Sequence, residues 1–474
     1  MNRSIRRVAV VAAFMIVALL VNITASYLLR ADSLNNNPQN RRVREAQFAQ
    51  PRGAILVGNT PVVQSKPATG RFPYTRAYSN GAMYAPVSGY FSFVYGRNKL
   101  EQFYNAQLTG THDSQALARL MDQLWGRQPE GASVQTTINA KAQQAAWNAL
   151  RGRKGAVVAI DYTTGAILAY VSTPSYDPAL LASSNLDATQ KAWKELNDDP
   201  NRPMSDRAGR EIYPPGSSFK LVTAAAALEA GWTPSTKVDS PSELTLPGTS
   251  TKMRNSGPCG GAKVSLEQAL RVSCNTAFAN VGLTLGQEAL QAQAERFGFN
   301  SNFGGDVNSA TSGFPSDLDK AQLAMSSIGQ YNVTASPLQM AVVAGAIAND
   351  GLVMRPYFVS EVRRADLSLV SANGPVSEGQ AVSVTSAQQL QQMMQTVVRS
   401  GTGTRAQVSG LTVGGKTGTA QSDKSRAPYA WFTGYATQPH VAICVFVEDA
   451  GSNEDQSGGR TAAPIFAAVL KALK

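Results

Sequence analysis

The sequence predicts an α+β fold for residues 151–474, with a mainly antiparallel sheet packed against helices. Two β-like runs at 156–160 and 166–171 flank a turn at 161–165 and indicate a β-hairpin. Helical segments rich in Ala and Leu follow. Three more strand-like runs and a last helix close the chain, at 411–420, 430–436, 441–448 and about 463–470. Strands at both ends of a region, with helices between them, are typical of this class.

The N-terminus carries a segment long enough to cross a membrane. Residues 8–29 contain no charged side chain, and a membrane-spanning helix needs roughly 20 apolar residues. Arg3, Arg6 and Arg7 precede this run, so we expect residues 1–7 to stay cytoplasmic and everything after Arg30 to lie outside. A cleaved signal peptide is the alternative, and the polar and small residues at 22–26 leave it open.

Residues 30–150 are predicted to form a polar stalk and then a small, irregular accessory domain. The segment from 31 to about 50 is rich in Asn and Arg, as linkers often are. Short β-like runs broken by Gly and Pro follow up to about residue 130. Helical spacing of apolar residues then indicates a helix within 137–150, with Asn139 as its cap.

Length, composition and charge narrow the class of protein. The chain has 474 residues, 43% of them hydrophobic and 16% charged, which suits a globular protein of two or three domains. Its net charge of +11 is spread along the chain, and no DNA- or RNA-binding motif accompanies the charge. We therefore expect an anionic cell envelope, and no nucleic acid, as its surroundings.

A serine and a lysine three residues apart open an apolar helix. Pro214, Pro215 and Gly216 end any preceding element, and an apolar run follows Lys220. The dipole and free N–H groups of the helix start favour negative charge at Ser217, and an apolar surround disfavours a protonated Lys220. The spacing brings both side chains within reach of each other, so Ser217 is a candidate nucleophile with its own base. A solvated helix start is the plain structural alternative.

A second motif supplies a hydroxyl and an amide. Ser273 and Asn275 follow a run at 266–272 whose apolar spacing indicates a helix that ends there. A hydroxyl can relay a proton, and an amide can bind a substrate carbonyl. We interpret both residues as site candidates.

A third motif lies on a strand-like run and consists of Lys416, Thr417, Gly418 and Thr419. The lysine adds positive charge near a substrate carboxylate, and the two threonines add hydroxyl partners. Because Gly418 has no side chain, an extended peptide can approach the strand closely.

Two rival kinds of site are disfavoured by the sequence. Residues 410–417 satisfy the phosphate-loop pattern G-x-x-x-x-G-K-T, but polar, turn-prone residues at 418–425 follow where that loop needs a helix. A Ser-His-Asp triad would have to recruit His112, in the accessory region, or His440, in a predicted turn. Lys220 is the more economical base.

The cysteines are too few for a disulfide framework. Cys259, Cys274 and Cys444 also lack the spacing of a metal site, so we expect neither a metal nor another cofactor. Outside the membrane, a Cys259–Cys274 disulfide and buried free thiols are both compatible with the sequence.

With Ser-x-x-Lys, Ser-x-Asn and Lys-Thr-Gly in this order, the chain resembles the penicillin-binding proteins and serine β-lactamases over about residues 150–474. Flanking residues resemble the monofunctional class B transpeptidases: Tyr176-Asp177-Pro178, Tyr213-Pro214-Pro215-Gly216, Gly329-Gln330, Pro337-Leu338-Gln339 and Gly414-Gly415. The single anchor and the region from Tyr84 to Arg97 look most like the actinobacterial penicillin-binding protein A group. Cys274 departs from the pattern, because β-lactamases commonly have Asp there.

The resemblance implies a fold and a mode of attachment. It predicts a five-stranded, mainly antiparallel sheet with helices on both faces, an all-helical subdomain, and an N-terminal domain that does not bind penicillin. It also implies a role in cell division and partners in the membrane, such as a polytopic glycosyltransferase or other division proteins.

The resemblance further implies a D,D-transpeptidase that cross-links peptidoglycan and is acylated by β-lactams. Ser217 would attack a stem peptide ending in D-Ala-D-Ala, with Lys220 as base. Backbone N–H groups of Ser217 and Thr419 would form the oxyanion hole. Ser273 and Lys416 would pass a proton to the departing D-Ala. Substrate binding would fall to Asn275, Thr417, Gly418 and Thr419.

Other functions stay open at this point. A β-lactamase or D,D-carboxypeptidase would let water release the acyl group. A class A β-lactamase needs a glutamate after the second motif, whereas Glu195 precedes Ser217. A non-catalytic division scaffold or a β-lactam sensor belongs to another class, and the seven residues before Val8 are few for a transducer.

Overall fold

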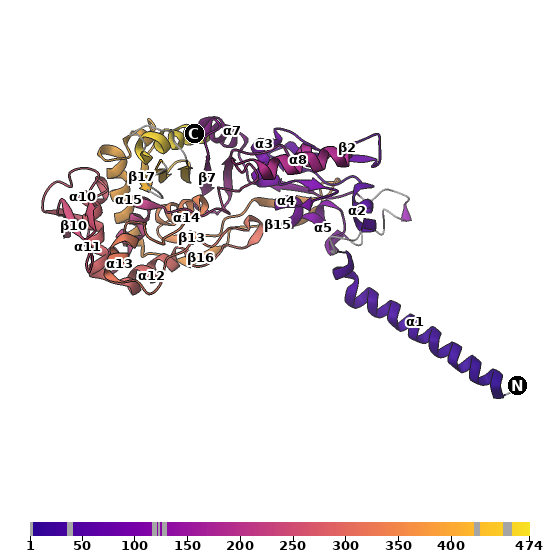
Figure 1. The fold of residues 1–474 in the computed structure, drawn as a ribbon. Coiled ribbons are helices and arrows are strands. Elements are labelled where there is room, and N and C mark those ends of the chain that lie inside the picture. Colours follow the sequence, from indigo (N-terminus) through magenta and orange to yellow (C-terminus); the bar gives the residue numbers. More distant parts are fainter. Residues whose placement is uncertain are drawn as a thin grey trace.

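The computed structural model describes residues 3–35, 41–115, 121, 124–125, 130–420, 427–448 and 457–474. Some residues used above lie outside these ranges: 1–2 of the predicted tail, 36–40 of the predicted stalk, and 116–120, 122–123 and 126–129 of the accessory region. Residues 421–425, which entered the argument against a phosphate loop, also lie outside them. The described chain forms a long N-terminal helix, a mixed sheet near that helix, and an antiparallel sheet surrounded by helices (Figure 1).

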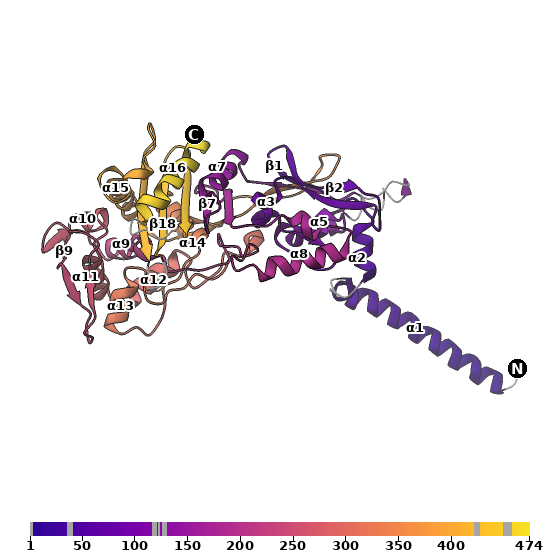
Figure 2. The ribbon, with the colours of Figure 1, turned by 45° about the horizontal axis from the view of Figure 1, so that its top comes forward.

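The N-terminal helix α1 (Arg3–Asn35) stands clear of the globular body in both ribbon views (Figures 1 and 2). It includes the predicted span 8–29, and its apolar side chains are exposed. By length and composition α1 is a candidate membrane span, the one found among the described residues.

The larger domain is built on a five-stranded antiparallel sheet, as predicted. Its order is β17-β18-β19-β7-β8. The strands are β7 (Gly155–Asp161), β8 (Ile167–Thr173), β17 (Val413–Ala420), β18 (Tyr429–Ala436) and β19 (Val441–Val447). Because β7 pairs with β19, the first strand of the domain lies beside the last, and β17 is left at an edge.

Alternating side chains of this sheet pack against helices on its two faces. Val157 and Val445 belong to the core that includes α7 (Ala140–Leu150) and α16 (Ala463–Leu473). Val158 and Cys444 point to the other core, with α14 (Pro337–Ala348). A strand places successive side chains on opposite faces, so two apolar layers explain why these strands are continuously hydrophobic. The helices on both faces confirm the predicted α+β architecture.

A cluster of helices lies beyond the β17 edge (Figure 1). Its members are α9 (Lys220–Glu229), α10 (Leu266–Arg271), α11 (Asn275–Leu285), α12 (Gln287–Arg296), α13 (Lys320–Ser326) and α15 (Val384–Ser400). Helix α9 is the centre, since every residue from Lys220 to Leu228 is buried and α11, α12 and α15 pack around it. A helix that is apolar on all sides belongs in such a core.

Short strands and one disulfide hold the outer loops of this cluster. Strand β9 (Lys237–Asp239) pairs with β12 (Lys263–Ser265), and β10 (Glu243–Thr245) pairs with β11 (Lys252–Arg254). Cys259, in the loop after β11, is bonded to Cys274 at the start of α11. The disulfide is thus the correct one of the two alternatives for these cysteines, and Cys444 is a buried free thiol.

The N-terminal region holds a six-stranded sheet with two strands from much later in the chain. Its order is β15-β14-β6-β1-β2-β3. The strands are β1 (Ile55–Val57), β2 (Thr60–Pro67), β3 (Tyr74–Tyr78), β6 (Ser133–Thr136), β14 (Val359–Arg363) and β15 (Leu369–Ala372). The sequence did not reveal this pairing, because β14 and β15 are short and lie between helices of the other domain.

Short helices cover the N-terminal sheet. They are α2 (Arg41–Phe48), α3 (Gly81–Ser88), α4 (Lys99–Phe103) and α5 (Asn105–Leu108). Helix α8 (Leu186–Asp198) runs beside this region (Figure 2), where Trp193 stacks on Tyr95. Under the helices, buried Glu101 accepts from Arg52 and from Arg76 at 2.6 Å each, so a carboxylate shared by two arginines fixes the sheet to α4.

Candidate active site

The predicted nucleophile sits on a tight turn before an apolar helix. Gly216–Phe219 forms a 3₁₀ turn (η3), and α9 continues it from Lys220, so the predicted helix start is confirmed. Gly216 has a φ of +53°, and a Cβ there would lie 2.7 Å from the carbonyl oxygen of Thr419. A residue with a side chain is excluded at this position. The turn, which includes Ser217, therefore lies directly against strand β17.

Lys220 is fully buried and faces the second motif. Its Nζ donates to Ser273 O at 2.8 Å, to Ser273 Oγ at 3.3 Å and to Asn275 Oδ1 at 2.7 Å. Burial lowers the pKa of Lys220 well below its usual value, and the charge of Lys416 lowers it further. An amine in this position readily exists in the neutral form that a general base requires.

Lys416 reaches the same serine from strand β17. Its Nζ donates to Ser273 Oγ at 2.8 Å and to the carbonyl oxygen of Thr417 at 2.9 Å. Burial lowers the pKa of Lys416 to about 7. The Ser273 hydroxyl thus lies between two amines and can pass a proton from one to the other.

Ser217 itself is not yet in contact with its expected base. Among the described residues, no hydrogen bond joins Ser217 Oγ to Lys220 Nζ, and three oxygens already accept from that amine. Catalytic hydrogen bonds are often long before substrate binds. Loss of the Lys220 proton, or a rotation of either side chain, is what this geometry requires before Ser217 is activated.

The remaining candidates of the third motif lie along the same strand. Thr417 Oγ1 is 2.7 Å from Thr402 Oγ1, and the exposed Thr419 accepts from the N–H of Gly458 through Oγ1 at 3.4 Å. A Cβ at Gly418 would lie 2.5 Å from Ser218 Oγ and 2.7 Å from the carbonyl oxygen of Pro215. The backbone that approaches Gly418 in the structure is therefore that of the nucleophile turn.

Side chains from each of the three motifs line one cleft of about 190 Å³. It is lined by Ser217, Ser256, Val272, Ser273, Asn275, Ile328, Gln330, Thr402, Thr417, Thr419, Ser457 and Gly459. The structure thus brings together residues from all three motifs. The sequence missed Ser256, Thr402 and Ser457, which come from loops without a chemical motif, and it marked Gln330 only as part of the flanking Gly329-Gln330 pair. The run Gly401-Thr402-Gly403 was the one usable signal, because two glycines around a hydroxyl indicate a close approach.

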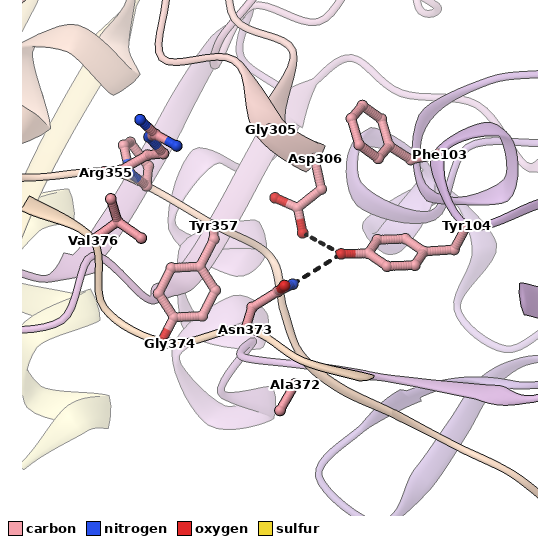
Figure 3. Close-up of a pocket in the computed structure, with 11 residues that line it drawn as sticks. Phe103, Tyr104, Gly305, Asp306, Arg355, Tyr357, Ala372, Asn373, Gly374 and Val376 are labelled. Atoms are coloured by element: carbon pink, nitrogen blue, oxygen red, sulfur yellow. Dashed lines mark hydrogen bonds between the residues drawn. The ribbon is translucent and has the colours of Figure 1, made fainter. Parts of the chain in front are cut away.

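A second cavity, of about 330 Å³, lies at the junction of the two domains (Figure 3). In it the buried Asp306 accepts from the N–H groups of Phe358 and Val359 at 3.0 Å each and from the Tyr104 hydroxyl at 3.2 Å. Asn373 in turn donates to that hydroxyl at 3.0 Å. These polar groups satisfy one another, and the cavity lies between the end of α4, η4 (Gly305–Val307) and the segments 355–357 and 372–376. We interpret it as a structural joint.

The phosphate loop and the Ser-His-Asp triad, the two rival kinds of site, are disfavoured by where their residues lie in the fold. Gly414–Thr417 lies inside strand β17, so the G-x-x-x-x-G-K-T pattern does not form a phosphate loop here. His440 lies at the β18–β19 turn near the Tyr162 ring, and His112 bonds Ser114 in the N-terminal region. Neither histidine lines the described part of the cleft.

Comparisons with known proteins agree with this geometry. Residues 155–471 match the family model of the penicillin-binding protein transpeptidase domain. The chain belongs to the penicillin-binding protein transpeptidase family. Residues 52–134 also match the model of the penicillin-binding protein A dimerisation domain.

Relatives match this penicillin-binding protein over its whole length. Peptidoglycan D,D-transpeptidase PbpA of Mycolicibacterium smegmatis is 42% identical over 100% of this chain and 99% of its own. The PbpA of Mycobacterium tuberculosis strain H37Rv is 39% identical over the same shares. These values confirm the resemblance to the class B, penicillin-binding protein A group.

Solved structures share the fold. The ceftriaxone acyl-enzyme complex of penicillin-binding protein A from M. tuberculosis superposes with a TM-score of 0.87 at 38% identity, covering 90% of this chain and 99% of that one. Pseudomonas aeruginosa PBP2 gives a TM-score of 0.72 at 29% identity over 90% and 96%.

Proposed function

We propose that this chain is a membrane-anchored peptidoglycan D,D-transpeptidase that works through an acyl-enzyme at Ser217. One arrangement carries the proposal: Ser217 and Ser273 line the same cleft, and the buried amines of Lys220 and Lys416 both donate to Ser273 Oγ. The names of the relatives as D,D-transpeptidases, and the acyl-enzyme complexes of the tuberculosis protein with ceftriaxone, imipenem and penicillin G, support it.

Each residue has a defined part in the proposed reaction. Ser217 Oγ bonds to the penultimate carbonyl carbon of a stem peptide ending in D-Ala-D-Ala, and its proton passes to neutral Lys220. The bond to the terminal D-Ala nitrogen breaks, and Lys416 supplies a proton to that nitrogen through Ser273 Oγ. An amine of a neighbouring stem then attacks the ester carbonyl and forms the new amide. The proton that this amine loses passes through Ser273 Oγ to Lys416, and Lys220 returns its proton to Ser217 Oγ as the ester bond breaks.

The surrounding groups hold the substrate in this proposal. The N–H groups of Ser217 and Thr419 form the oxyanion hole, which the contact of Gly216 with the Thr419 backbone supports. Asn275 binds the peptide, Thr417 and Thr419 bind its carboxylate beside Lys416, and Gly418 lets the nucleophile turn pack against the strand that binds the peptide. β-Lactams imitate the donor and remain bonded to Ser217 Oγ.

Intact mass spectrometry with penicillin tests the acyl-enzyme. We expect one penicillin per chain, with the adduct mapped to Ser217 after proteolysis. Ser217→Ala should abolish it, while Ser218→Ala, the matched neighbour whose hydroxyl is buried and has no partner, should retain it. An adduct that survives in Ser217→Ala would refute the proposal.

The lifetime of this adduct separates a transpeptidase from a hydrolase. The described lining of the cleft contains no carboxylate that could activate water. We therefore expect an adduct that persists for minutes or longer. Release within seconds would instead favour a β-lactamase or a D,D-carboxypeptidase.

The proposal extends to topology and domain division. Residues 1–7 are the cytoplasmic tail, 8–29 the anchor, 30–150 the stalk and accessory domain, and 151–474 the transpeptidase domain. The arginines before the span support an extracytoplasmic catalytic domain, and the ranges of the two family matches support the division. Protease added outside intact spheroplasts should digest the chain beyond Arg30, and complete protection would contradict this topology.

A polytopic glycosyltransferase or other division proteins are the proposed partners, and cell division is the proposed process. Complementation of a depletion strain tests how far catalysis matters there. Full rescue by Ser217→Ala would show that a scaffold role suffices.

A further inference from the structure

The Ser-x-Asn loop has a backbone conformation that its surroundings must maintain. Ser273 has a φ of +60°, in the left-handed region that residues with a side chain rarely adopt. The next residue, Cys274, occupies the N-cap position of α11, but its side chain makes no capping hydrogen bond. The first free N–H groups of α11 therefore need another acceptor.

That acceptor is a side chain from outside the helix. Asn255 directly follows strand β11, and its Oδ1 accepts from the N–H of Asn275 at 2.7 Å and from the N–H of Thr276 at 3.0 Å. In most helices the side chain of the N-cap residue accepts these hydrogen bonds. In α11 the acceptor instead lies 20 positions before Asn275 in the chain.

Asn255 is itself held in a fixed orientation. Its Nδ2 donates to the carbonyl oxygen of Pro241 at 3.1 Å and to Thr276 Oγ1 at 3.0 Å. The adjacent Arg254 carbonyl accepts from Asn275 Nδ2 at 3.0 Å, which leaves Asn275 Oδ1 directed at Lys220 Nζ, 2.7 Å away. The end of β11 thus determines where the Asn275 amide points, and through it one of the three contacts of the proposed base.

We propose that Asn255 is a positioning residue for acylation. It caps α11 from outside the helix and so holds Ser273 and Asn275 against Lys220. This inference rests on the proposed function, because it concerns the same serine acylation. Asn255 acts through the loop and does not touch the reacting atoms. The acceptor Oδ1, rather than the donor Nδ2, is the atom that matters.

Three variants separate this role from general stabilisation. Asn255→Ala removes both capping bonds. Asn255→Asp keeps an oxygen acceptor for both N–H groups, adds negative charge that a helix N-terminus favours, and loses the donations to Pro241 and Thr276. Asn280→Ala is the matched control, because Asn280 Nδ2 tethers the same helix to the carbonyl oxygen of Asp239 at 2.9 Å but lies away from the first turn.

The measurement is the second-order rate constant for acylation by a fluorescent penicillin, with the unfolding temperature recorded in parallel. We expect Asn255→Ala to react about 10- to 100-fold more slowly, since displacement of a catalytic group by about 1 Å can cost up to 10²-fold. Asn255→Asp should stay within about threefold of the wild type, and so should Asn280→Ala. Asn255→Ser, which is too short to reach the helix, carries the same expectation as Asn255→Ala and replaces it if that variant does not fold.

Each other outcome overturns a defined statement. Wild-type rates in Asn255→Ala or Asn255→Ser would overturn the positioning role. Asn255→Asp as slow as Asn255→Ala would show that donation by Nδ2 is what counts. Asn280→Ala as slow as both would show that acylation depends on the general attachment of α11 and not on the cap that Asn255 provides. A wild-type chain that is not acylated at Ser217 would contradict the proposed function instead.

Discussion

At the scale of residues, the unusual feature is one serine hydroxyl placed between two buried lysines. Ser273 Oγ accepts from Lys416 at 2.8 Å and from Lys220 at 3.3 Å. Two amines this close disfavour double protonation, and none of the hydrogen bonds of Lys220 or Lys416 in the described part of the chain goes to a carboxylate. One neutral and one charged amine is the state that suits the reaction, because the first is a base and the second attracts a carboxylate.

The pH dependence of acylation should reflect these two amines. A lysine with a lowered pKa loses its proton at lower pH, so the rate should rise as Lys220 becomes neutral. It should fall again as pH increases past about 7, where Lys416 loses the charge that attracts the substrate carboxylate. Stopped-flow acylation across pH 5–10 provides the measurement.

Lys416→Arg should remove the falling limb of this pH profile at a lower overall rate, because a guanidinium stays charged. A rate that keeps rising to pH 10 in the wild type would exclude this assignment.

Gly418 should tolerate no side chain. In Gly418→Ala the new Cβ meets Ser218 Oγ at 2.5 Å and Pro215 O at 2.7 Å, so the nucleophile turn must move away from β17. We expect acylation to slow by at least about tenfold. Gly374→Ala is the control, since a Cβ there has no neighbour within 4 Å. Equal acylation rates in the two variants would show that the turn does not depend on this contact.

At the scale of elements, the sequence predicted the helices and strands that local periodicity or end signals define. It missed the strands that depend on pairing with distant segments. The strands of the central sheet, the Asn139 cap of α7 and the helix start after Ser217 all follow from periodicity or punctuation, and the structure confirms them. Strands β14 and β15 were missed because they join the sheet only through the pairing of β14 with β6, more than 200 residues earlier. Thr402 and Asn255 were missed for a similar reason, because only the folded chain brings Thr402 against Thr417 and Asn255 against the start of α11.

The Cys259–Cys274 disulfide should support the Ser-x-Asn loop. It closes a loop with a sequence separation of 15, for which chain-entropy arguments give about 3 kcal/mol of stabilisation. We expect the double variant Cys259→Ser/Cys274→Ser to unfold at a lower temperature and to be acylated about 3- to 10-fold more slowly. Calorimetry and the fluorescent penicillin assay measure the two effects.

A reductant provides the matched control for this disulfide. Treatment of the wild type should reproduce the double variant, and a Cys444→Ala chain should respond to reductant as the wild type does. Cys444 is buried, and its pKa is raised to about 12, so it should stay unreactive in the native protein. Unchanged acylation after full reduction would mean that the loop is held without the disulfide.

At the scale of the whole molecule, the two domains are joined by more than the chain that connects them. Strands β14 and β15 complete the N-terminal sheet, and Asp306 bonds Tyr104 across the junction. Lys99 of α4 also pairs with Asp206, which lies shortly before the nucleophile turn and accepts from Tyr170. The N-terminal domain is therefore attached to the catalytic domain by a shared sheet, a hydrogen bond and an ion pair.

Removal of the N-terminal helix should leave the two domains folded. A chain that begins at residue 41 should stay soluble and be acylated within about twofold of the full-length rate. A chain that begins at Pro51 loses Phe48, which packs with Phe72, Phe91 and Phe93, and should unfold several degrees earlier, because loss of a buried Phe commonly costs about 3–5 kcal/mol. Thermal melts and acylation rates of the two chains test this, and identical melts would show that α2 contributes nothing to the fold.

A crystal structure of the penicillin adduct tests the central claim most directly. We predict an ester bond to Ser217 Oγ, with the acyl oxygen 2.7–3.1 Å from the N–H groups of Ser217 and Thr419. The ligand carboxylate should lie beside Lys416 and Thr417, and Ser273 Oγ should remain bonded to both lysines. An adduct on any other side chain, or a cleft in which Lys220 and Lys416 no longer meet at Ser273, would contradict the account.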